Sequence, residues 1–97
     1  MPEQDTTFPL MGRQYELRRT DDGIDDESDA DCDPPWWQGP VELRVRPTAT
    51  GQRELELLLH ESAHILDWHI DEEIIQQWGE QVSHLLFNVL GYRRPSE

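Results

Sequence analysis

Apolar residues recur at helical spacing over two segments in the second half of the chain. The first segment runs from Arg53 to Leu66, and the second runs from Asp71 to about Leu90. Spacings of three and four residues place each apolar set on one side of a helix, so both segments are predicted to be amphipathic helices. The apolar positions are Leu55, Leu58, Leu59, Ile65 and Leu66 in the first segment and Ile74, Ile75, Trp78, Val82, Leu85, Leu86 and Val89 in the second. Because the connector 67–70 is short, the two helices should pack roughly antiparallel.

The second predicted helix has a clear signal at each end. Asp71 can cap its first turn, and the acidic pair Glu72 and Glu73 suits the positive N-terminal end of a helix dipole. Gly91 is a natural stop at the C-terminal end. These signals place the helix between residues 71 and 91.

Alternation of apolar and polar residues predicts a strand before the first helix. In the stretch from Val41 to Arg46, the side chains of Val41, Leu43 and Val45 share one face. The stretch 14–19 alternates more weakly and is a second candidate. We therefore expect an α+β fold in which two antiparallel helices pack with a small β-sheet or hairpin.

The other segments show no such periodicity. Residues 1–12 and 95–97 should form flexible tails, which leaves a single small domain over residues 13–94. Eight acidic residues lie between Thr20 and Asp33, and their mutual repulsion predicts a disordered or loosely held loop over residues 20–35. A Ca²⁺ site is the alternative for this segment, but the D-x-D-x-D-G spacing is absent. The adjacent Trp36 and Trp37 should dock on the domain, although they could instead line a substrate cleft.

Composition narrows the classes of function. The chain has 97 residues and a formal net charge of −13, which argues against binding to nucleic-acid phosphates or to anionic membranes. Cys32 is its single cysteine, so an intramolecular disulfide is excluded and a reducing compartment is favoured. The sequence shows no secretory signal pattern and no apolar run of membrane-spanning length. We expect a soluble cytoplasmic protein.

The candidate chemistry lies in the first predicted helix, where His60-Glu61-Ser62-Ala63-His64 reads H-E-x-x-H. Residues four apart share one side of a helix, so the two imidazoles can bind one Zn²⁺ ion while Glu61 acts on a water. The apolar positions of this helix cluster on the side opposite His60 and His64. Both histidines should therefore point to a cleft or to solvent.

A catalytic zinc site needs a third protein ligand. Glu72 is favoured because it opens the second helix beside the edge of its apolar stripe, and Gly79 leaves room next to it. Asp67 lies one turn after His64 and could reach the metal or hold a ligand imidazole through a hydrogen bond. The remaining candidates are His69, Glu73, Glu80 and His84, which are expected to face solvent.

From Leu57 to Arg94 the chain resembles small bacterial and phage proteins of the zincin-like type, and with the preceding strand the match extends from Pro40 onward. In those proteins H-E-x-x-H is followed by an Asp-aromatic step, a helix that opens with Glu, and a Gly-Tyr-Arg end. The corresponding elements here are His60 to His64, Asp67-Trp68, Glu72-Glu73 and Gly91-Tyr92-Arg93. The resemblance implies a minimal gluzincin, a class in which the third zinc ligand is a Glu on the helix after the motif.

The leading hypothesis is a zinc-dependent metallopeptidase in which Glu61 is the general base, with Tyr92 or His69 as weak candidates for stabilising the oxyanion. A peptide or protein substrate could add as a strand to the stretch from Val41, if that stretch is a sheet edge. One alternative is a zinc-stabilised interaction module without catalysis. Another is a metal-free protein whose acidic segment binds a basic partner. Cys32 could also bind the zinc and block it.

Overall fold

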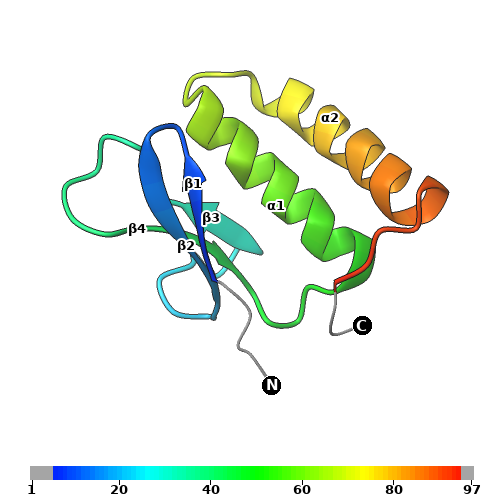
Figure 1. Cartoon of the computed structure of the whole chain (residues 1–97), viewed down its shortest axis with the longest axis horizontal. Coiled ribbons are helices and arrows are strands. Elements are labelled where there is room, and N and C mark those ends of the chain that lie inside the picture. The colour runs from blue at the N-terminus through cyan, green and yellow to red at the C-terminus, as the bar shows by residue number, and fades with distance from the viewer. Residues whose placement is uncertain (1–5, 95–97) are drawn as a thin grey trace.

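The computed structural model describes residues 6–94, and this part of the chain forms four strands, two α-helices and one π-helical turn (Figure 1). The elements are β1 (Thr7–Leu10), β2 (Arg13–Arg19), β3 (Ala30–Cys32), β4 (Val41–Val45), α1 (Gly51–Leu66), α2 (Glu72–His84) and the π-helical turn Leu85–Val89. The strands make one small mixed sheet, and α1 lies between this sheet and α2 (Figure 1). The expected α+β fold is confirmed.

The sheet has the strand order β1-β2-β4-β3. β2 and β4 run parallel, whereas β1 and β3 pair antiparallel to their neighbours. The predicted strand that begins at Val41 is therefore internal, and the idea that it offers an edge to a peptide is wrong. β3 is the edge strand at the opposite end of the sheet from β1.

The first strand corrects the expectation of a flexible tail over residues 1–12. Within its described part, residues 7–10 form β1, which pairs with β2 through a two-residue turn. Both turn residues, Met11 and Gly12, have positive φ values of 51° and 78°, as a type I′ hairpin turn requires. Phe8 then packs against Tyr15 in the core. Residues 1–5 and 95–97 lie outside the described part of the chain.

The acidic segment is also more ordered than its charge predicts, because arginines from other elements neutralise it. Arg44 on β4 forms ion pairs with Asp31 at 2.6 Å and with Asp33 at 2.9 Å. Arg46 and Arg53 bind two further aspartates of the segment. These contacts hold β3 on the sheet, so residues 30–32 of the expected loop form a strand, while the rest of residues 20–35 contains no helix or strand.

The core lies between the sheet and α1. It comprises Tyr15, Val41, Leu43, Val45, Ala49, Leu57 and Ile65. The buried Tyr15 hydroxyl donates a hydrogen bond to the carbonyl of Asp33 at 2.8 Å, so its polar atom is satisfied. Burial raises the pKa of this phenol to about 12.

The contacts between α1 and α2 join the end of one helix to the start of the other, as in an antiparallel pair. Near the connector, His64 meets Glu72, and at the far end Gln52 meets Ser83. Between them Gly79 lies against α1, where a Cβ atom would be 3.4 Å from the carbonyl oxygen of Glu56. The absent side chain therefore brings the two helix axes close together.

The burial of the helices departs from the predicted apolar stripes. α2 presents Ile75, Gly79 and Ser83 to α1, while Ile74 and Trp78 stay exposed. Trp36 and Trp37 are both more than half exposed, so the expectation that they dock on the domain is met only in part, by an edge-on contact between the Trp36 and Trp68 rings. Neither helix in the described range is long and apolar enough to cross a membrane.

Candidate metal centre

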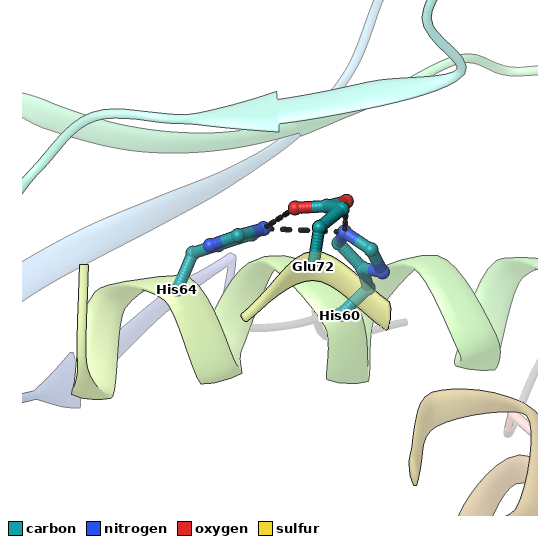
Figure 2. A group of neighbouring side chains, drawn as sticks. All are labelled: His60, His64 and Glu72. Carbon is teal, nitrogen blue, oxygen red and sulfur yellow. Dashed lines mark hydrogen bonds and ion pairs between the residues drawn. The ribbon is translucent and has the colours of Figure 1, made fainter. Parts of the chain in front are cut away.

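Three potential metal ligands converge where the start of α2 crosses α1. His60 Nε2 lies 2.7 Å from one carboxylate oxygen of Glu72, and His64 Nε2 lies 2.9 Å from the other. The two Nε2 atoms are 3.2 Å apart. Figure 2 shows both imidazoles directed from α1 toward the Glu72 carboxylate. One ligand atom from each residue lies within 4.8 Å of the other two, so this group could hold a metal ion.

The chemistry of this donor set favours a cation at its centre. Two imidazole nitrogens and a carboxylate all direct lone pairs or shared protons at one small volume. The histidines are mostly covered, with side-chain exposures of 14% and 20%, whereas Glu72 is 66% exposed. The centre is thus held firmly from the α1 side and remains open to solvent from the α2 side.

Local sequence explains how the third ligand reaches the histidines. The spacing of four residues places His60 and His64 on one side of α1. Asp71 caps α2 by accepting a hydrogen bond from the backbone N–H of Glu73 at 2.8 Å, which fixes the first turn where Glu72 lies. The close approach at Gly79 then sets the distance between the two helices.

The other candidate ligands lie outside this group. Asp67 ends α1, and its carboxylate accepts a hydrogen bond from the backbone N–H of His69 at 3.1 Å, so these contacts give no support to a role in holding an imidazole. Glu80 accepts from Gln76, and His84 contacts Asn88 near the far end of α2. Among the described residues, no second group of three or more His, Cys, Asp or Glu side chains converges in this way.

Glu61 lines the same cleft as the three ligands. A cavity of about 360 Å³ lies between α1, the first turns of α2 and the segment that enters β3, with Glu61 on its wall. Burial raises the pKa of Glu61, and the neighbouring His60 and His64 oppose that rise. A carboxylate whose pKa is raised toward neutrality is a better proton acceptor and donor at neutral pH.

Cys32 lies near the centre but outside the ligand group. Its Sγ atom contacts the backbone carbonyl oxygen of Glu61 at 3.6 Å. Burial, reinforced by the charge of Glu61, raises the pKa of this thiol. The structure therefore places Cys32 against the helix backbone, and the hypothesis that it covers the metal site gains no support from this contact.

A second hollow opens on the other side of Glu61 and His64. It has a volume of about 300 Å³, and Trp68 forms its outer wall. The Trp68 ring lies 6.4 Å from the His64 ring and 5.4 Å from the Trp36 ring, between ring centroids. The Trp36 and Trp68 rings thus form an aromatic wall that begins at His64.

Sequence reasoning missed that the acidic segment lines the cleft. Asp29 and Asp31 belong to the wall of the larger cavity, opposite Glu56 and Gln76 on the helices. The available signal was Arg44 on the polar face of the predicted strand, since an arginine there needs an acidic partner.

Comparisons of the chain with models of protein families, with curated proteins and with solved structures found no match. The interpretation of the site therefore rests on its own geometry.

Proposed function

We propose that the chain is a zinc-dependent peptidase in which His60, His64 and Glu72 hold Zn²⁺ and Glu61 is the general base. The observation that carries this proposal is the convergence of these three ligands on one point beside Glu61, at the base of an open cleft. A bound zinc ion would polarise the carbonyl of a substrate and lower the pKa of a water molecule.

The ligand spacing fits zinc. In a tetrahedral zinc site with Zn–N distances of about 2.0–2.1 Å, two ligand nitrogens lie about 3.3 Å apart. The Nε2 atoms of His60 and His64 are 3.2 Å apart. The Glu72 oxygens are closer to these nitrogens than that, because they bind them directly, and a shift of about 0.5 Å would open the required space.

The chain's own residues supply the proton transfers. The Glu61 carboxylate accepts a proton from a water molecule as the water oxygen bonds to the carbonyl carbon, and it later donates that proton to the amide nitrogen as the C–N bond breaks and the amine leaves. Burial raises the pKa of Glu61, which makes its carboxylate a stronger base toward water.

The outer edge of β3 favours an extended peptide as substrate. The backbone N–H of Asp33 donates to the carbonyl of Glu42 on β4, and the carbonyl of Asp29 accepts from the N–H of Arg46, just after β4. By the alternation of an antiparallel ladder, the backbone groups of Ala30 and Cys32 point away from β4, toward the cleft. A peptide could pair with them as an added strand and lie above Glu61.

A second candidate function is a zinc-stabilised module without catalysis. It is favoured by the position of the ligands, because a metal held by His60, His64 and Glu72 would tie the start of α2 to α1. In a chain of 97 residues with a small core, such a link contributes substantially to stability.

Zinc content and peptide cleavage separate these functions. We expect about one zinc per wild-type chain, much weaker binding after His60→Ala or Glu72→Gln, and unchanged binding after Glu73→Gln, which alters the exposed neighbour of Glu72. The Glu61→Gln variant should keep its zinc and lose at least about 100-fold in cleavage of a mixed peptide library. Full activity of that variant would refute the mechanism. If the wild-type protein binds zinc and unfolds in a chelator but cleaves no peptide, the result would instead support the zinc-stabilised module. If neither the wild-type protein nor His60→Ala contains zinc, both proposed functions would be excluded.

A further inference from the structure

One face of α2 and its π-helical extension is apolar and exposed. Ile74, Trp78, Leu85 and Val89 expose 59%, 43%, 46% and 63% of their surface. Together with the half-buried Val82, these residues make the outer face of α2, which adjoins the face of Ile75, Gly79 and Ser83 that packs on α1. Contiguous apolar surface of this extent on a small soluble protein marks an interaction site.

The flank of the outer face within α2 and its extension lacks formal charge, whereas Asp71 lies at the N-terminal end of that face. Its exposed flank consists of Gln77, Gln81, His84 and Asn88, whereas the carboxylates of α2 lie at other positions around the helix. This absence is unusual in a chain with 21 acidic residues and a net charge of −13. Two copies brought together at this face would avoid the like-charge repulsion that opposes contact elsewhere on the surface.

The order of residues along the outer face is self-complementary. Ile74 lies as far before the step from Gln81 to Val82 as Val89 lies after it, and Trp78 and Leu85 are related in the same way. A two-fold axis at that step would therefore place Ile74 against Val89 of a second copy and Trp78 against Leu85. Such reciprocal pairing is what an isologous interface requires.

We propose that a second copy of this chain docks on the outer face of α2, with the two α2 helices antiparallel. The four helices then form a bundle in which each α2 packs between its own α1 and the other α2. Glu72 and Gln76 line the cleft between α2 and α1, so the metal centre of each copy stays open in the dimer.

The exposed area sets the expected strength. Each of the four exposed side chains offers on the order of 100 Å² of accessible surface, so two copies would bury on the order of 800–1,000 Å² of it. The flanking amides add to this area, which places the interface at the lower end of specific ones. We therefore expect a dissociation constant in the micromolar range.

Sedimentation of the full chain from about 1 to 500 µM, with and without zinc, tests this proposal. The mass should rise from 11.4 kDa toward twice that value in the wild-type protein. Trp78→Glu should weaken the association at least about 10-fold, whereas Trp37→Glu, the same change at another exposed tryptophan, should leave it unchanged. Circular dichroism of both variants would verify that they fold.

A charge-pair experiment tests the register. Trp78→Lys and Leu85→Glu should each impair self-association, and a mixture of the two should form a heterodimer, because Lys at one position would face Glu at the other. The proposal is overturned if the wild-type protein stays monomeric at the highest concentration, which would leave a different protein as the occupant. It is also overturned if Trp37→Glu, rather than Trp78→Glu, abolishes the dimer.

Discussion

The position of Glu72 should depend on Gly79, which lies two helical turns further along α2. A Cβ atom at Gly79 would be 3.4 Å from the carbonyl oxygen of Glu56 and 3.9 Å from the backbone nitrogen of His60. A single added methyl group therefore just fits, but a longer side chain does not. Because the obstacle is backbone, the helices must separate to accept it.

Two substitutions at this position separate helix propensity from helix spacing. Gly79→Ala should stabilise the protein by about 0.5–1 kcal/mol, because alanine is the better residue in a helix interior. Gly79→Leu has a similar propensity gain, but overpacking should cost about 1–3 kcal/mol and leave it less stable than the alanine variant. Urea denaturation in the presence of a chelator measures this difference without any contribution from metal.

Zinc affinity should respond more strongly than stability. If α2 moves by about 1 Å, the Glu72 carboxylate moves with it while both histidines stay on α1, so the ligand geometry is lost. We expect zinc binding by Gly79→Leu to be weaker by about 10-fold to 100-fold, and binding by Gly79→Ala to stay within a few-fold of wild type. Competition with a chromogenic chelator measures both. Equal zinc affinity in the two variants would show that the helix spacing at Gly79 does not position the third ligand.

Two further predictions concern the walls of the cleft. Arg44→Gln should destabilise the fold by about 2–3 kcal/mol in urea denaturation, because it leaves Asp31, Asp33 and Glu42 clustered without their shared cation. Burial alone would raise the pKa of Glu42, but hydrogen bonds from Arg44 and Arg18 outweigh it and lower that pKa. The stability that the ionised Glu42 contributes is therefore present at neutral pH, and it is lost as the pH falls through the folded-state pKa, below 4.5. Trp68→Ala should lower kcat/KM about 10-fold for peptides with an apolar side chain in the second hollow and leave zinc content unchanged. Trp37→Ala is its matched control, and an equal loss in both variants would contradict a specific role for Trp68.

The grouping of His60, His64 and Glu72 could be predicted from the sequence because each of its parts carries a local signal. Two histidines at a spacing of four indicate one side of a helix, and a glutamate beside a capping aspartate indicates the start of the next helix. The short connector then leaves few ways to arrange the helices. The choice of Glu72 over Glu73 followed from helical geometry, and the structure places only Glu72 against the histidines.

The strands that depend on distant contacts could not be predicted in this way. β3 is short and its central residue is Asp31, which gives no alternation to detect. It forms because Arg44 on the neighbouring strand binds it. The hairpin of β1 did have a signal, since Phe8 and Leu10 alternate before a turn with Gly12, but the strand is brief and contains Pro9.

The apolar pattern of α2 identifies the helix correctly but misplaces its contact with α1. Small residues decide that contact, because Gly79 and the buried Ser83 let the backbones approach, while the larger Trp78 and Leu85 would hold them apart. A pattern of hydrophobic positions indicates that one face of a helix is to be buried, but it does not indicate which partner buries that face. The apolar arc of α2 is wider than the strip that α1 covers, and the uncovered part is uncharged and symmetric along the helix. Selection against exposed apolar surface would remove such an excess unless another surface covered it, so the mismatch between pattern and burial is itself an argument for the second copy.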